Sequence, residues 1–377
     1  MKSLAVAIVF LVLAAGCGER AGDESPSQKA AIQIDTLEVI MQIGTDFSDS
    51  TTSFWHITDA TIDNTGNILV LDRFGANLKM FDGSGEYVRL VARDGNGPGE
   101  LVMPWDMFMF NDGRLMVLDP GKRGFVVFDD SLRFVEELGL WQQNQPFQSC
   151  AASDSQFAAY KGSYDATETE LILHRRVALY TYGHEDWDRL LWQDSLVLPK
   201  MDVIENRSLL YNNFEEPLTI CGDGAGTVYF SQKSGSDYSI TGWSVDGEEL
   251  LDISMDLPPV EKTADELKAE STYVTDNWAS RGNVGPEWEY QPEPYKNMIV
   301  DIDIGPDGNL WARRGTTPTP FFDIFAPSTG ELLGRAVFPD SGWSWKVEVC
   351  SNGILAWEED PESGYQVVYV LAPKGSS

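Results

Sequence analysis

A tandem repeat in the first half of the chain limits the possible folds more than any other feature. Residues 59–82 (DATIDNTGNILVLDRFGANLKMFD) and 106–129 (DMFMFNDGRLMVLDPGKRGFVVFD) align without a gap over 24 positions, 47 residues apart. Each copy alternates apolar and polar residues and turns at Asn, Asp and Gly. In each copy, a second apolar run ends in Asp and a third ends in Phe-Asp. The pattern predicts three successive antiparallel strands joined by short turns.

Weaker copies of this unit continue towards the C-terminus, at 146–182, 219–247, 301–330 and 345–371. About six units with a period of roughly 40–50 residues and several strands each are typical of a β-propeller, because one small sheet cannot bury both of its faces. The leading segment, 34–43, has no hairpin of its own, and we expect it to complete the last blade and close the ring. A pair of β-sandwiches or an open β meander is the alternative.

Two motifs resemble those of NHL-repeat and related six-bladed β-propeller proteins. One is the string Arg93-Asp-Gly-Asn-Gly-Pro-Gly-Glu-Leu101, followed by Pro104, and the other is Asp-x-x-Gly-Asn-Ile-x-Val-x-Asp at 63–72. The resemblance implies an all-β, six-bladed propeller over 33–373. It implies little about activity, since one fold serves many functions. The glycines of the first motif precede no helical pattern, so they do not indicate a nucleotide-binding loop.

The N-terminus has the features of a targeting segment. Residues 1–16 hold an apolar run of about a dozen residues, too short to span a bilayer comfortably. The sequence Ala14-Ala15-Gly16-Cys17 resembles the lipobox of bacterial lipoproteins, which implies cleavage before Cys17 and lipidation of its thiol. A plain secretory signal is the alternative.

The lipobox interpretation places the protein in the cell envelope, attached to a membrane through Cys17 on the periplasmic or cell-surface side. Gly18, rather than Asp, follows the cysteine and favours the outer membrane. The rest of the polar segment 17–32 is then a flexible tether, and residues 374–377 are a short tail.

The charge of the chain argues against nucleic-acid partners. Lys and Arg number 27 against 59 Asp and Glu, a formal net charge of −32. A surface this acidic repels phosphate backbones.

The repeat also predicts a polar mouth on one face of the disc. Asp59, Asp106 and Asp301 each lie seven residues before a turn glycine, which puts them at the start of inner strands. Ends of second strands and the loops between blades belong to the same face. The other residues expected there are Arg73, Lys122, Arg123, Arg313 and Arg314, together with His56 and Trp105.

Three interpretations of this mouth remain open. In the first, Asp59, Asp106 and Asp301 together hold Ca²⁺ or another hard cation, and the resemblance to gluconolactonases and paraoxonases implies a metal that polarises a lactone or ester carbonyl. The Glu and Asn ligands of those families are not matched, because Gln148 and Thr219 occupy the equivalent positions. Alternatively, each Asp accepts backbone N–H bonds. We favour a non-catalytic protein that binds a peptide, glycan or partner protein; a metal-dependent lactonase or esterase and an envelope scaffold are the alternatives.

The largest departure from the repeat is the insertion 256–298 between blades four and five. It predicts a helix over Glu261–Arg281, with Thr263 as N-cap and Glu266 three residues later. The insertion should emerge at the mouth, either as a lid or contact surface or as a cover for a sheet edge.

Histidine and cysteine give few further signals. The chain has three His, of which His56 lies nearest the mouth, and it lacks Gly-x-Ser-x-Gly, HExxH and CxxC strings. After lipidation of Cys17, the remaining cysteines are Cys150, Cys221 and Cys350, an odd number. We expect them to be reduced and packed, with a Cys150–Cys221 disulfide as the alternative.

Overall fold

The computed structural model divides the chain into Met1–Ala31 and Ile32–Ser377. It describes residues 33–139, 145–184, 186–200, 217–280, 289–317, 321–339, 345–360 and 362–375. The predicted signal segment, the lipidation site Cys17 and the tether lie outside these ranges. In the described part, no helix is both long and apolar enough to cross a membrane.

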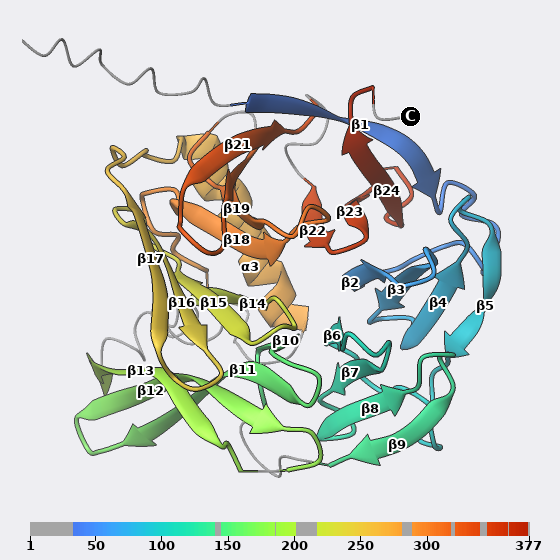
Figure 1. The fold of residues 1–377 in the computed structure, drawn as a ribbon, viewed down its shortest axis with the longest axis horizontal. Helices are drawn as coiled ribbons and strands as arrows, with labels where there is room; N and C mark the ends of the chain where they lie inside the picture. The colour runs from blue at the N-terminus through green and yellow to red at the C-terminus, as the bar shows by residue number, and fades with distance from the viewer. Residues whose placement is uncertain are drawn as a thin grey trace, which may run out of the picture. The chain divides into compact units, whose positions relative to one another are not determined.

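The second unit is a six-bladed β-propeller (Figure 1). Blade one contains β2 (Ile57–Ile62), β3 (Ile68–Asp72), β4 (Asn77–Phe81) and β5 (Tyr87–Ala92). Blade two contains β6 (Asp106–Met109), β7 (Leu115–Asp119), β8 (Gly124–Phe128) and β9 (Phe134–Leu138). Blade three contains β10 (Gln148–Ala151), β11 (Gln156–Ala166), β12 (Glu170–Thr181) and β13 (Arg189–Pro199).

The other three blades follow in chain order. Blade four contains β14 (Leu218–Gly222), β15 (Thr227–Gln232), β16 (Tyr238–Ser244) and β17 (Glu249–Met255). Blade five contains β18 (Ile299–Ile304), β19 (Leu310–Arg314), β20 (Phe321–Phe325) and β21 (Leu332–Val337). Blade six contains β22 (Lys346–Cys350), β23 (Gly353–Glu359), β24 (Gln366–Pro373) and, from the other end of the chain, β1 (Gln33–Ile43).

The N-terminal strand closes the ring, as the sequence predicted. Residues Leu37–Ile43 of β1 pair antiparallel with β24 and supply the outer strand of blade six. The first residues of the same strand, Gln33–Thr36, pair in parallel with β21, so β1 also joins blade six to blade five in one eight-stranded sheet. The N-terminal strand β1 is therefore hydrogen-bonded to strands of both blade five and blade six.

The six innermost strands contact one another around a closed circuit, from β2 through β6, β10, β14, β18 and β22 back to β2. Figure 1 shows these strands around the centre of the disc. A closed circuit excludes the open meander and the pair of sandwiches.

The core lies between neighbouring blades. Strands β3 and β7 are buried along their whole length, because each lies inside its sheet and has a neighbouring blade on both faces. One core cluster packs Phe108 and Phe125 of blade two against Phe157 and Tyr180 of blade three. Burial of such aromatic faces between blades holds the ring together.

The Asp that ends the second strand in blades one and two has a structural role. The carboxylate of Asp72 accepts hydrogen bonds from the backbone N–H groups of Trp55 and His56, at 2.8 and 3.0 Å. That of Asp119 accepts them from Val102 and Met103, at 2.7 and 3.0 Å. Each Asp satisfies the backbone of the loop that enters its own blade, which explains why the repeat carries it.

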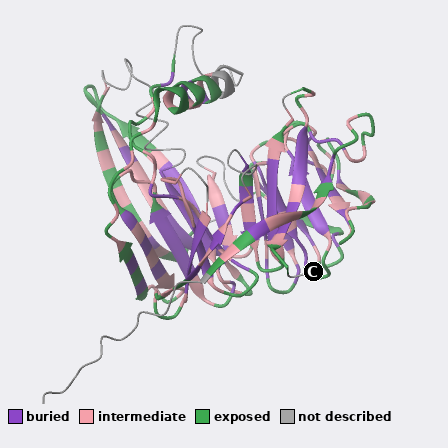
Figure 2. Ribbon diagram, turned by 90° about the horizontal axis from the view of Figure 1, so that it is seen from above, coloured by how far each residue is buried: buried purple, intermediate pink, exposed green. Residues whose placement is uncertain are grey.

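The insertion forms the predicted helix, α3 (Ala264–Ser280). It begins at Ala264, not Glu261, because Thr263 is the cap. Glu266 N–H donates to Thr263 Oγ1 at 3.3 Å, and Thr263 N–H donates to Glu266 Oε2 at 2.8 Å, the reciprocal bonds of a capping box. Figure 2 shows α3 outside the blades, with much of its surface exposed. Tyr290 is buried against it, donating its N–H to Thr275 Oγ1.

Candidate functional site

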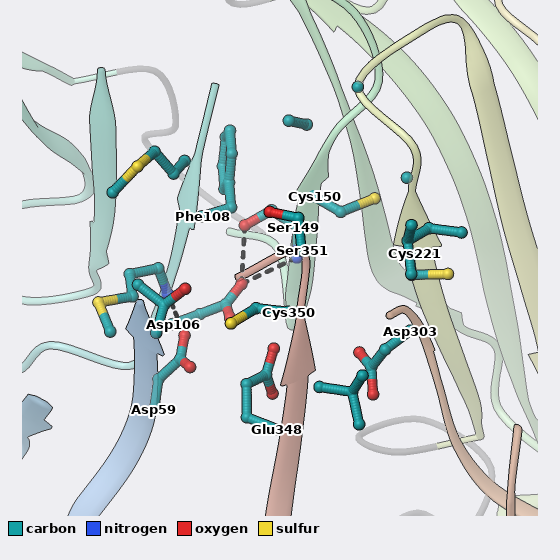
Figure 3. Close-up of a pocket in the computed structure, with 18 of the residues that line it drawn as sticks. Asp59, Asp106, Phe108, Ser149, Cys150, Cys221, Asp303, Glu348, Cys350 and Ser351 are labelled. Carbon is teal, nitrogen blue, oxygen red and sulfur yellow. Dashed lines mark hydrogen bonds between the residues drawn. The ribbon is translucent and has the colours of Figure 1, made fainter. Parts of the chain in front are cut away.

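The six inner strands enclose a pocket of about 340 Å³ on the propeller axis (Figure 3). Side chains alternate between the two faces of a strand, so residues i and i+2 of each inner strand point towards the axis. This spacing produces two layers of lining side chains. The first layer holds Asp59, Asp106, Gln148, Thr219, Asp301 and Glu348, and the second holds Thr61, Phe108, Cys150, Cys221, Asp303 and Cys350.

The structure brings Asp59, Asp106 and Asp301 into this one pocket. Asp59 and Asp301 each follow a register irregularity in their strand, after Ile57 and Ile299 respectively. A β-bulge re-aims the side chains that follow it, which is a common device beside binding sites.

Two further carboxyl groups in the pocket were missed by the sequence analysis. Asp303 lies two residues after Asp301, so strand alternation was the available signal. Glu348 was missed because the turn between β22 and β23 of blade six is shorter than in the other blades, with Cys350 paired directly to Gly353. Alignment on the turn glycine therefore selects Lys346 in place of Glu348.

Most polar side chains of the first layer connect one blade to the next. Asp59 Oδ2 accepts a 2.7 Å hydrogen bond from the backbone N–H of Met107. Asp106 Oδ2 accepts from the backbone N–H and the hydroxyl of Ser149, at 2.9 and 2.8 Å. Gln148 Oε1 repeats the pattern with the N–H of Ile220, at 3.2 Å. The expected alternative, in which these Asp residues accept backbone N–H bonds, therefore describes Asp59 and Asp106, and Asp301 Oδ1 likewise accepts the N–H of Ile302 at 3.0 Å.

Asp303 and Glu348 differ from these acids. Asp303 is only 9% exposed, and its Oδ2 atom has no hydrogen-bond partner within the described part of the chain. Across the same residues, no hydrogen bond joins the Glu348 carboxyl to the protein. Figure 3 shows both side chains projecting into the pocket, with Glu348 between Asp59 and Asp303. A buried acceptor without a partner costs free energy, so this part of the pocket is suited to a donor from outside.

Burial disfavours the charged form of every one of these acids. It raises the pKa of Asp59, Asp303 and Glu348 well above the usual range, with a further increase from neighbouring carboxylates. Burial also raises the pKa of Asp301, and that of Asp106 to about 6. The neighbouring Asp106 carboxylate adds to the rise in the pKa of Asp59, as expected for two acids in one site.

Little positive charge compensates this cluster. The residues that line the pocket, all of them described, include six carboxyl groups, those of Asp59, Asp106, Asp223, Asp301, Asp303 and Glu348, but no Lys, Arg or His. Arg313 lies behind Asp301 and Asp303, where burial lowers its pKa and those two carboxylates oppose the shift. Its Nη2 donates to the backbone carbonyl of Trp345 at 2.7 Å. A cation bound in the pocket would therefore favour the ionised form of these acids, and its binding would be coupled to proton release.

The other residues predicted at the mouth do not line this pocket. The Arg73 guanidinium lies 4.3 Å from the ring centroid of Trp105, and His56 stacks on Phe74 at 4.6 Å. Arg123 is exposed, with a φ of 59°. The basic and aromatic residues form loop contacts, while the carboxyl groups face the axis.

The three described cysteines also face the pocket, as free thiols without a Cys150–Cys221 disulfide. Burial raises the pKa of each, which keeps the thiols protonated and weakly nucleophilic. Within the described ranges, no three His, Cys, Asp or Glu side chains are arranged to hold one metal ion.

Comparisons with known proteins agree with the fold. Residues 55–185 match the model of the family DUF5128, described as a 6-bladed beta-propeller. No curated protein matches the chain.

Several solved structures are similar at low identity. A protein from Bacteroides fragilis NCTC 9343 has 11% identity and a TM-score of 0.48, over 91% of this chain and 100% of that one. Regucalcin, a calcium-binding protein from Agrobacterium tumefaciens, has 11% identity and a TM-score of 0.39, over 90% and 97%. A gluconolactonase from Xanthomonas campestris has 13% identity and a TM-score of 0.43, over 85% and 88%. Likenesses this weak say nothing about ligand or activity.

Proposed function

We propose that this chain is a binding protein whose axial pocket takes the ammonium or guanidinium group of a ligand. The observation that carries the proposal is the buried Asp303 carboxylate, whose Oδ2 has no partner in the described residues and which lies beside Glu348 in a pocket of about 340 Å³. A cationic donor would satisfy Oδ2 and offset the repulsion among the acids. Hydrogen bonds between charged groups are about twice as strong as neutral ones.

The size and lining of the pocket support an organic cation. Pockets for small molecules have volumes of roughly 300–1,000 Å³, so a cavity of about 340 Å³ holds more than a single ion. Phe108, Ile62 and Val349 add apolar surface beside the carboxyl groups. Among the ligands expected from the sequence, a peptide presenting Lys or Arg, or an amino sugar, fits this combination.

Isothermal titration calorimetry with agmatine, lysine methyl ester and glucosamine tests the proposal, with N-acetylglucosamine as the neutral counterpart of the last. We expect binding of at least one amine to weaken by tenfold or more in Asp303→Asn and in Glu348→Gln. The exposed acid Asp130 provides the matched control, and Asp130→Asn should bind like the wild type.

A calcium titration in the same experiment tests the metal interpretation. Calcium binding that is lost in Asp303→Asn, with no binding of any amine, would replace the organic cation by a metal ion. Binding that persists unchanged in both pocket variants would disprove the pocket as the site.

We also propose that the protein is anchored to the cell envelope by lipid on Cys17, with the propeller on the periplasmic or cell-surface side. The support is the lipobox-like sequence before Cys17. Metabolic labelling with an alkyne fatty acid should tag the wild type and not Cys17→Ala. Label retained in the variant would contradict the anchor, and recovery in the inner-membrane fraction would contradict the preference for the outer membrane.

A further inference from the structure

Blade three carries an extension that the ring does not need. Strand β11 has 11 residues and β12 has 12, whereas β7 and β8 of blade two have five each. Inner strand β10 pairs only with Phe157–Tyr160 of β11. The remainder of β11 continues outward with β12 and β13, up to the pairs Ala166–Leu171 and Glu170–Pro199. Among the described residues, this part of the sheet pairs with no strand of another blade.

Three polar side chains on one face of the extension form a continuous hydrogen-bonded chain. His174 Nδ1 lies 3.0 Å from Ser195 Oγ, and His174 Nε2 lies 3.0 Å from Asp165 Oδ2. Ser195 is the direct cross-strand partner of His174, and Asp165 is its diagonal neighbour on β11. A hydroxyl bonded to an imidazole, which is itself oriented by a carboxylate, is the arrangement that activates a serine nucleophile.

The opposite face of the sheet fixes this geometry. Arg175 and Asp194 are the next cross-strand pair, joined by two hydrogen bonds of 2.7 and 2.5 Å. Such a bidentate contact is specific in its geometry as well as strong. Leu173, on the other side of His174, is fully buried. The residues before and after His174 therefore both stabilise the register that places His174 opposite Ser195.

The hydroxyl is accessible, and a cation lies near it. Ser195 is exposed on β13, and the His174 side chain is 42% exposed. Arg176 is two residues from His174 on the same face and is the cross-strand partner of Gln193, so it is diagonal to Ser195. Diagonal neighbours lie about 7–8 Å apart, within reach of a long side chain. A guanidinium there can stabilise negative charge that develops on a carbonyl attacked by Ser195.

We propose that Ser195 is an activated nucleophile that accepts the acyl group of an ester. Ser195 Oγ bonds to the ester carbonyl carbon as its proton passes to His174 Nδ1. The carbon–alkoxide bond then breaks, and the alkoxide takes that proton and leaves as the alcohol. Water, deprotonated by His174, cleaves the acyl-serine and restores the hydroxyl.

Asp165 acts as a positioning residue that holds the imidazole and stabilises its charged form. Because the face is open to water, activated esters are the expected substrates, and an anionic group on the acyl side would favour contact with Arg176. This site is separate from the axial pocket and does not depend on the ligand proposed there.

The test uses the full chain and a fluorophosphonate probe, which forms a Ser195 Oγ–phosphorus bond and releases fluoride. We expect peptide mass spectrometry to find the probe on Ser195. His174→Gln should slow labelling by about 100-fold, and Asp165→Asn by about tenfold with a changed pH profile.

Ser163→Ala is the matched control. Ser163 is the other cross-strand partner of His174, but both ring nitrogens of His174 are already bonded elsewhere. This variant should be labelled at the wild-type rate. Labelling no greater than in Ser195→Ala would overturn the proposal, and so would an equal rate in folded His174→Gln, with folding checked by circular dichroism.

Discussion

The backbone N–H of Met107 donates a 2.7 Å hydrogen bond to Oδ2 of Asp59, across 48 residues of sequence and from one blade to the next. The bond from Ser149 N–H to Asp106 repeats this arrangement one blade further on. The axial acids therefore divide into two groups. Asp59 and Asp106 join neighbouring blades, whereas Asp303 has an unpartnered Oδ2 in the pocket beside Glu348.

The junction between Asp59 and Met107 predicts different effects for two substitutions at Asp59. Asp59→Ala leaves the Met107 N–H buried without an acceptor, and we expect it to lower the free energy of unfolding by about 1–3 kcal/mol. Asp59→Asn keeps an acceptor oxygen and resembles the protonated acid, so its stability at pH 7 should be close to that of the wild type. Urea denaturation of both variants is the measurement. Equal losses in the two would show that the hydrogen bond to Met107 is not what matters.

The buried acids predict that stability falls as the pH rises above mild acidity. A carboxyl group with a raised pKa binds more protons in the folded than in the unfolded state, so its ionisation opposes folding. For Asp106 the loss begins near the ordinary value of 3.8 and continues through about 6; for Asp303 and Glu348 it continues to higher pH. At the acid end, hydrogen bonds from Ser84 and Glu86 lower the pKa of Asp82, and the stabilisation from this exposed group is lost as the pH falls.

We therefore expect the free energy of unfolding to be greatest at mildly acidic pH, as measured by urea denaturation from pH 4 to pH 8. The double variant Asp303→Asn/Glu348→Gln should show a smaller decrease between pH 6 and pH 8. A decrease as steep as that of the wild type would mean that other groups cause it.

Closure by β1 predicts a large effect of one buried leucine. Leu37 is 1% exposed and packs in the core shared by blades five and six. Leu37→Ala should cost about 2–5 kcal/mol of stability. Ile40, on the same strand, is 54% exposed, so Ile40→Ala should cost far less. A similar loss in the two variants, measured by denaturant unfolding, would contradict the role of Leu37 in closing the ring.

The capping box predicts a local effect in the insertion. Thr263→Ala removes the acceptor of the Glu266 N–H bond and should destabilise the start of α3 by about 1 kcal/mol. Hydrogen–deuterium exchange should become faster in the first turn of the helix, with no change in the blades. Faster exchange throughout the propeller would show that α3 contributes to the stability of the whole fold.

The buried thiols of the pocket are expected to react slowly with thiol reagents. Because burial raises the pKa of Cys150, Cys221 and Cys350, we expect native protein to react with Ellman's reagent far more slowly than protein in guanidinium chloride. A Cys17→Ala background isolates these three thiols. Rapid reaction of native Cys350 would mean that the pocket opens more widely than the structure shows.

Local patterns were enough to predict the propeller, its six blades, the closing strand and the helix with its Thr263 cap. Each depends on alternation, turn residues or capping, which act within a few residues. The same alignment selected Asp59, Asp106 and Asp301 for one pocket. It missed Glu348, because a tighter turn shifted the register of blade six.

The repeat in the sequence thus determined that this chain forms blades around an axis and that acids from several blades point to it. Only the tertiary structure decided what each acid does. Whether a carboxylate oxygen accepts an N–H from the next blade, as in Asp59, or faces the pocket without a partner, as Oδ2 of Asp303 does, depends on how sheets distant in sequence are rotated and bulged against each other. The chain of Asp165, His174 and Ser195 likewise exists only because strand register brings together residues from three strands.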